Sequence, residues 1–144
     1  MATFSATRRG AIRALEAITT GATNPVVILM TAAHDFDAAV GALTISDVVA
    51  DEASPTSYAR QPLAFAGAVA IDGNGRAAVT WTDTSFGVLG GAVDQAIGGA
   101  YVADFTGNDA TSDLLHRIPF GTAISTDGTV FTIRWQTPTA RADP

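Results

Sequence analysis

The stretch PVVILM at residues 25–30 decides the fold class of this chain. The five residues after the proline form a continuous apolar run that is rich in β-branched side chains and too short for a helix of its own. Asn24 and Pro25 supply a turn signal just before it. A run that is apolar at every position is typical of a strand covered on both faces. We therefore expect residues 26–30 to form a central strand of a sheet.

The stretch TVFTIRW at residues 129–135 shows the alternation of a half-buried strand. Phe131, Ile133 and Trp135 share one face of it, and Val130, Thr132 and Arg134 share the other. This period of two predicts a strand whose aromatic and aliphatic face is turned to the core.

The middle of the chain predicts a hairpin and further strands. DGNGR at residues 72–76 is a turn sequence suited to positive φ, and apolar runs flank it at residues 68–71 and 77–81. Further strands are expected at residues 100–105 and 114–118. Turns in which Gly stands next to Asn or Asp lie beside them, at residues 106–109 and 126–128. Short strands with such turns indicate antiparallel architecture rather than a parallel sheet.

The predicted fold is mainly β, an antiparallel β-sandwich or partly open barrel with a short N-terminal α-helix. We expect one domain over residues 1–144, because a chain of this length can bury roughly two thirds of its unfolded surface. Its core is expected at about residues 25–136, where most of the eleven aromatic side chains fall. A polar tail follows at residues 137–144.

The N-terminal helix is predicted at about residues 7–20, where Ile12, Leu15 and Ile18 recur at helical spacing before Gly21.

Arg8 and Arg9 would lie in the first turn of this helix, where the helix dipole disfavours cations. An acidic partner would offset that cost, so Arg8, Arg9 and Arg13 are candidate interface residues. The alternative is that they are solvated arginines, with Arg13 and Glu16 as a loose ion pair.

Residues 31–57 are predicted to be a long surface excursion that offers only weak extended pieces, at residues 43–45 and 47–49. A stretch of this length is usually functional or ordered by a neighbour. We therefore expect interfaces at the helix, at this excursion and at the tail.

The composition excludes several classes of function. The formal net charge is −6 and all eight basic residues are arginine, which disfavours general nucleic-acid binding. The absence of Cys excludes disulfides and thiolate metal sites. Charged residues make up 15% of the chain, against about a quarter in typical soluble proteins. Either part of the surface meets a partner, or the composition follows from a GC-rich genome.

Neither a membrane span nor a secretory signal is expected. No apolar stretch approaches the 18 or more residues that a span requires. The first ten residues carry two arginines but lead into an interrupted, alanine-rich pattern. We expect assembly in the cytoplasm.

No catalytic residue, cofactor or metal is predicted. His34 and His116 are the available acid/base groups at neutral pH, and neither stands in a recognisable motif. HDFD at residues 34–37 could offer metal ligands, but alternating side chains would point apart, and a polar loop is the simpler interpretation.

The acidic turns and the glycines likewise favour structural roles. DGNG at residues 72–75 lacks the remaining ligands of an EF-hand. Asp104, Asp109 and Asp113 could hold Ca²⁺, although a plain Asx-rich turn explains them. The glycine-rich middle has no Lys or following helix to make a phosphate loop, and its glycines are interpreted as bulges and bends: Gly87, Gly90, Gly91, Gly98 and Gly99.

The segment EASPTSYARQ at residues 52–61, followed by an apolar strand through Leu63, Ala64 and Phe65, resembles the SYARQ segment of small tailed-bacteriophage virion proteins. The resemblance spans roughly residues 20–136, and the chain departs from it at residues 92–95 and in its longer tail. It implies a minor tail, tail-fibre-associated or head-decoration protein of a virion.

Tyr58 and Arg60 share one side of this segment. We expect them to organise the excursion, with the Tyr58 ring packed beneath it and the Arg60 guanidinium bonded to loop carbonyls. A direct interface role is the alternative.

The resulting hypothesis is a non-enzymatic structural component of a phage or phage-like particle, either a capsid decoration, minor capsid or tail-associated protein. Its expected partners are major capsid or tail proteins and copies of itself. One alternative is a module that binds host surface or glycans through Trp81, Tyr101 or Trp135. Another is a small hydrolase that uses His34 or His116 with Asp.

Overall fold

A computed structural model of the chain describes residues 22–71, 73–135 and 140–142. The helix predicted at residues 7–20, with Arg8, Arg9 and Arg13, lies outside the described residues. The described structure is 45% strand and 12% helical, with antiparallel sheets of which none is closed. The mainly β prediction is therefore confirmed, and none of the sheets formed by these residues closes into a barrel.

The chain divides into two compact units. The larger contains Thr23–Leu63 and Thr84–Ile133, and the smaller contains Ala64–Asp83 with the described residues before Thr23 and after Ile133. The expectation of one domain stays a prediction.

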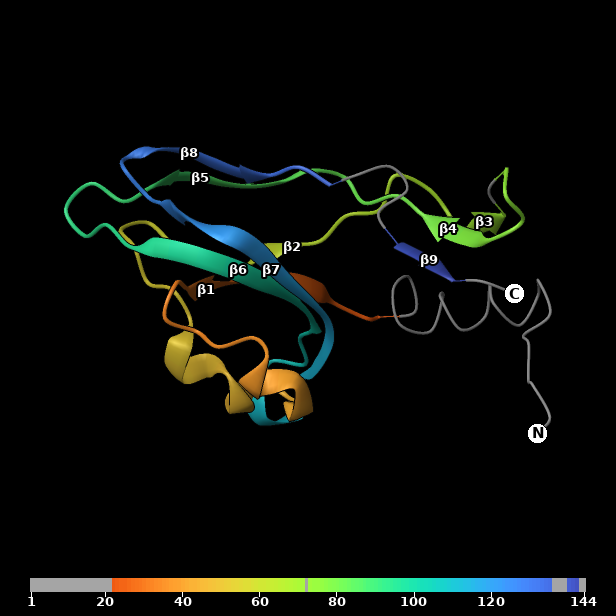
Figure 1. The fold of residues 1–144 in the computed structure, drawn as a ribbon, viewed down its shortest axis with the longest axis horizontal. Coiled ribbons are helices and arrows are strands. Elements are labelled where there is room, and N and C mark those ends of the chain that lie inside the picture. Colours follow the sequence, from red (N-terminus) through yellow and green to blue (C-terminus); the bar gives the residue numbers. More distant parts are fainter. Residues whose placement is uncertain (1–21, 72, 136–139, 143–144) are drawn as a thin grey trace. The chain divides into compact units, whose positions relative to one another are not determined.

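The larger unit is built on a four-stranded antiparallel sheet in the order β2-β1-β6-β7 (Figure 1). Its strands are β1 (Pro25–Thr31), β2 (Gln61–Pro62), β6 (Ala96–Asp104) and β7 (Asp113–Ser125). The five residues between the ends of β1 are all buried. This confirms the central strand predicted at residues 26–30, and β6 and β7 confirm the strands expected at residues 100–105 and 114–118, with longer bounds.

Gly99 in β6 shows why a residue without a side chain is needed inside the sheet. A Cβ at this position would lie closer than 3.0 Å to the Phe36 ring and to the carbonyl oxygen of Ile118. The glycine therefore lets the Phe36 ring lie directly on the strand. Its neighbour Gly98 falls at a register shift between β6 and β7, a bulge as the sequence predicts.

Three short 3-10 helices cover one face of this sheet: η1 (Ala38–Gly41), η2 (Ile45–Asp47) and η3 (Val49–Asp51). They bury a cluster with the sheet that consists of Val26, Ile28, Met30, Phe36, Ile45, Val48, Tyr101 and Ala103.

The weak extended piece predicted at residues 47–49 is therefore wrong, and of the piece predicted at residues 43–45 only Thr44 is extended, in an isolated antiparallel bridge with Asp113. The reason is local: the Asp47 carboxylate accepts hydrogen bonds from the backbone N–H groups of Leu43 and Thr44, each at 2.9 Å. Asp35 does the same for Asp37 and Ala38 at 3.0 Å. Such side-chain bonds favour turns over strands.

A two-stranded ribbon, β5 (Thr84–Leu89) paired with β8 (Thr129–Ile133), lies on the other side of the sheet from the 3-10 helices (Figure 1). Phe131 and Ile133 of β8 are half-buried and buried, whereas Val130 and Thr132 are exposed. This confirms the predicted alternation.

The smaller unit holds β3 (Ala70–Ile71), β4 (Ala77–Val79) and β9 (Ala140–Ala142), in the order β3-β4-β9. β3 and β4 pair as the predicted hairpin, with Gly75 at φ 78° in the turn. β9 was not predicted, because it falls in the stretch expected to be a polar tail. Trp81 is buried in this unit.

Candidate interaction surface

Arg60 joins Glu52 of the excursion to Asp109, which begins the 3-10 helix η4 (Asp109–Thr111) between β6 and β7. Its Nε donates to Glu52 Oε1 at 2.8 Å and its Nη2 to Glu52 Oε2 at 2.6 Å. The same guanidinium donates from Nη1 and Nη2 to the two carboxylate oxygens of Asp109, at 2.6 and 3.0 Å. Its Cζ also lies 5.5 Å from the centre of the Phe105 ring. Arg60 thus bonds carboxylates where loop carbonyls were expected.

Tyr58 extends the same network into the sheet. Its hydroxyl accepts from the backbone N–H of Leu29 at 3.1 Å and donates to Glu52 Oε1 at 2.9 Å. Its ring stacks on Phe86 with centroids 6.1 Å apart. Tyr58 therefore links the excursion to the central strand and to the ribbon.

The pKa shifts within this network keep Arg60 and Asp109 charged and Tyr58 neutral. Burial, and then the nearby Glu52 carboxylate, raises the pKa of Tyr58, so its hydroxyl stays protonated. The hydrogen bonds to Glu52 and Asp109 raise the pKa of Arg60. The bond from Arg60 lowers the pKa of Asp109. At neutral pH the network is therefore fully hydrogen-bonded.

His34 forms a second, separate constellation. Its Nδ1 lies 2.8 Å from Asp51 Oδ2 and its Nε2 lies 3.1 Å from the Tyr101 hydroxyl. The imidazole is only 3% exposed and meets the Phe36 ring edge to face. Both ring nitrogens are engaged inside the protein, so the constellation joins η3 to β6.

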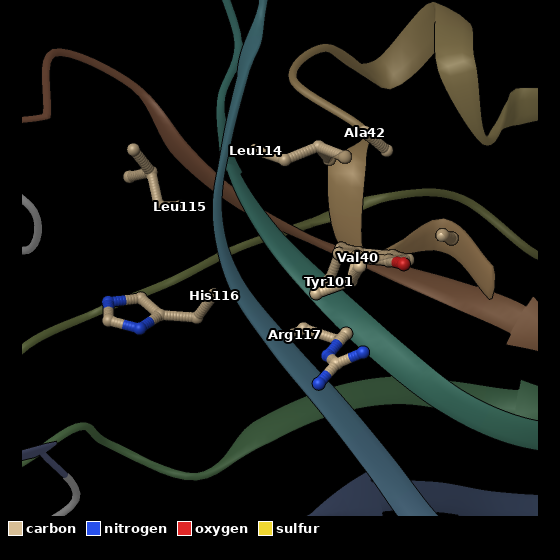
Figure 2. A pocket seen from close by; sticks show the side chains of 8 residues that line it. Val40, Ala42, Tyr101, Leu114, Leu115, His116 and Arg117 are labelled. Atoms are coloured by element: carbon tan, nitrogen blue, oxygen red, sulfur yellow. The ribbon is translucent and has the colours of Figure 1, made fainter. Parts of the chain in front are cut away.

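Next to Tyr101 lies a shallow hollow of about 180 Å³ between η1 and β7. Its lining residues are Ala39, Val40, Ala42, Tyr101, Leu114, Leu115, His116 and Arg117. In Figure 2, Leu114 and Arg117 point to the side of β7 where Val40 and Ala42 lie, and Leu115 and His116 point to the other side. The change of side follows from the register shift opposite Val102 and Ala103.

Val40 lines this hollow, and Leu43 follows the lining residue Ala42 in the chain; each of the two side chains is 74% exposed. Both backbone groups of Leu43, the N–H and the C=O, are nevertheless hydrogen-bonded. Its N–H donates to Asp47, and its carbonyl accepts from the N–H of Leu114, both at 2.9 Å. We call Val40, Leu43 and the hollow the apolar patch, although His116 and Arg117 also line the hollow.

The acidic turns do not gather into a metal site. Asp109 is bonded to Arg60, and Asp104 Oδ1 accepts from the backbone N–H of Asn24 at 2.8 Å. The Asn108 side chain accepts from Ala110 N at 2.9 Å, which is the Asx turn considered as the alternative. Within residues 22–71, 73–135 and 140–142, no three His, Cys, Asp or Glu side chains are placed to hold a metal ion.

Two of the three aromatic residues considered for glycan stacking are buried, and the third is half-buried. Trp81 is 4% exposed and Tyr101 is 3% exposed. Trp135 is half-buried and meets Trp81 edge to face at 4.9 Å. Neither Trp81 nor Tyr101 offers an open ring face to a sugar.

Sequence reasoning missed the partners of the residues that it selected. Asp109 and Asp51 carry no local signal, since Asp109 lies 49 positions from Arg60 and Asp51 lies 17 positions from His34. Glu52 opens the segment at residues 52–61, but its bond to Arg60 was not predicted. Val40 and Leu43 fit the expectation of an interface in the excursion, but only the structure singles them out.

No family model, no curated protein and no solved structure matches this chain. No helix in the part of the chain that the structure describes is long and apolar enough to cross a membrane.

Proposed function

We propose that this chain is a non-enzymatic β-sandwich component of a tailed phage or phage-like particle, a capsid decoration, minor capsid or tail-associated protein, that acts through protein–protein contacts. The resemblance of residues 52–61 to virion proteins supports the kind of particle. The apolar patch supports the mode of action, because exposed apolar groups gathered at one place mark interaction sites.

The observation that carries this proposal is the combination of exposure and rigidity at Leu43. The side chain of Leu43 is 74% exposed while its backbone is bonded at both N–H and C=O, so the backbone that carries it is fixed before any partner arrives. An apolar anchor on a fixed backbone loses little backbone entropy on binding. The Glu52–Arg60–Asp109 network would hold the same layer against the sheet.

Such a protein would work by repetition. Contacts near or below the standard interface size, about 1,200–2,000 Å², become strong when a symmetric particle offers them many times over. Other virion proteins and further copies of this chain are the proposed partners.

The test is binding of the purified full chain to particles from a phage strain that lacks its gene. We expect the wild-type chain to co-sediment with these particles at a saturable copy number. Val40→Asp with Leu43→Asp should weaken binding at least about tenfold, which corresponds to 1.4 kcal/mol. Val93→Asp, at a residue 51% exposed elsewhere, is the matched control. Equal binding by both variants, or no binding by the wild type, would contradict the proposal.

A further inference from the structure

The excursion is acidic around the apolar patch. Residues 31–59 hold five Asp and Glu residues and no Lys or Arg. The side chain of Asp37 is fully exposed and lies 3.5 Å from Arg117, which lines the hollow. The Asp47 carboxylate is also exposed and accepts the backbone N–H of Leu43 at 2.9 Å. A ligand of the patch should therefore combine apolar and basic side chains.

The chain itself contains a segment of this chemistry. Residues 7–20, for which the sequence predicts a helix, bring Ile12, Leu15 and Ile18 to one side at helical spacing. Three arginines and one glutamate give this segment a net charge of +2, so the rest of the chain carries −8 against a total of −6. Opposite net charges favour contact between the segment and the excursion.

The larger unit begins close to the apolar patch. Pro25, at the start of β1, lies opposite Asp104 of β6, and Asp104 lies opposite Asp113 of β7. Asp113 in turn forms an antiparallel bridge with Thr44, the residue after Leu43. Neighbouring strands are about 4.8 Å apart, so three such steps place the start of β1 about 15 Å from the patch.

The connection is long enough for the segment to reach the patch of its own chain. Asn24 is held beside Asp104, whose Oδ1 accepts its backbone N–H at 2.8 Å. Three residues, 21–23, separate Asn24 from the segment and span up to about 10 Å. A helix over residues 7–20 would be about 21 Å long. So short a connection gives an effective concentration of about millimolar, which a segment from a separate molecule would have to exceed.

We infer that residues 7–20 bind the apolar patch of their own chain, with their apolar side on Val40 and Leu43 and their arginines among the surrounding carboxylates. The acidic partner expected for these arginines is then the excursion of the same chain. A particle protein that docks on the patch must first displace the segment, so the contact controls when the chain assembles. The inference deepens the proposed function and rests on it for this consequence.

Cysteine cross-linking of the full chain tests the contact. The wild type has no Cys, so a pair of introduced thiols reports on itself alone. Gly41→Cys lies between Val40 and Leu43, and nothing lies within 4 Å of a Cβ added there. Ala11→Cys leaves the apolar residues of the segment in place. In a glutathione redox buffer this pair should form an intramolecular disulfide at least about tenfold more stable than Ala11→Cys with Val93→Cys, the matched control at a residue 51% exposed.

Gel mobility and charge reversal identify the occupant. A disulfide that joins two chains would show that a second copy supplies the segment, and would overturn the inference, as would equal stability of the two disulfides. Arg8→Glu, Arg9→Glu and Arg13→Glu together should weaken the disulfide to Gly41→Cys at least about tenfold, and Asp37→Arg added to them should recover part of the loss. A disulfide unchanged by the three substitutions would also overturn the inference. Circular dichroism checks that each variant is folded.

Particle binding separates this inference from the proposed function. The oxidised pair keeps the patch covered, so the cross-linked chain should co-sediment with particles at least about tenfold more weakly than the reduced chain. A cross-linked chain that binds as well as the reduced chain contradicts the proposed function alone, because the patch is then not the docking surface. A pair that fails to cross-link contradicts the inference alone, because particle binding by the wild type does not depend on it.

Discussion

Arg60 joins two carboxylates that are distant in sequence, and its removal should therefore be costly. Arg60→Ala leaves Glu52, only 13% exposed, without its cation. Removing one partner of a buried ion pair costs about 3–5 kcal/mol. Because Asp109 is 31% exposed and partly hydrated, we expect a loss of about 2–3 kcal/mol in the free energy of unfolding.

Urea unfolding at neutral pH measures this change. Arg60→Lys is the control: it keeps the charge but cannot bond both carboxylates with a planar fork, so it should recover only part of the loss. An Arg60→Ala protein as stable as the wild type would show that the network adds nothing.

Tyr58→Phe isolates one hydroxyl of the same network. The substitution keeps the ring on Phe86 but removes the acceptor for Leu29 N and the donor to Glu52. An unsatisfied backbone N–H within a buried central strand such as β1 costs about 1–3 kcal/mol. We expect a stability loss in this range with an unchanged strand signal in circular dichroism. A loss below about 0.5 kcal/mol would mean that water replaces the hydroxyl.

Asp109 makes the free energy of unfolding depend on pH. Its pKa in the folded chain is lowered by the hydrogen bond from Arg60, so its contribution is fully present above the unfolded pKa of about 3.9. The contribution is lost as the pH falls through the folded value. Asp109→Asn should therefore be less stable than the wild type at pH 7, and the difference should shrink below about pH 4. Thermal midpoints from pH 7 to pH 2 measure it, and a constant difference would contradict this explanation.

Within β6, Gly99 tests the contact between the 3-10 layer and the sheet. Gly99→Ala would place a methyl group against the Phe36 ring and the Ile118 carbonyl. Overpacking of this kind costs about 1–3 kcal/mol. Gly67→Ala, where nothing lies within 4 Å, is the matched control and should be nearly neutral. Equal unfolding midpoints for the two variants would show that the Phe36 ring moves away from residue 99 at no cost in stability.

The strands β1, β3, β4 and β8 were predictable because their signals are local. The apolar run of β1, the alternation of β8 and the turn of the β3–β4 hairpin each lie within a few consecutive residues. The 3-10 helices were not predictable, because they depend on how Asp35 and Asp47 bond nearby N–H groups. β2 and β5 were missed because a two-residue strand and a glycine-interrupted one have no clear period.

At the scale of the molecule, side-chain hydrogen bonds hold the excursion to the sheet and to Arg60. Residues expected to be a surface loop cover a face of the sheet and carry the exposed Val40 and Leu43. Selection of Tyr58 and Arg60 was possible from the sequence, but their partners Glu52 and Asp109 come together only through the fold. The apolar patch likewise depends on β7 lying beside η1.

The most direct measurement of the central claim is quantitative mass spectrometry of particles purified by density gradient from the organism that encodes this chain. If the chain is a structural component, it will be found in the particles at a constant copy number relative to the major capsid or tail protein, in step with the particle's symmetry. Its absence from washed particles, or a copy number that varies from one preparation to the next, would contradict the account.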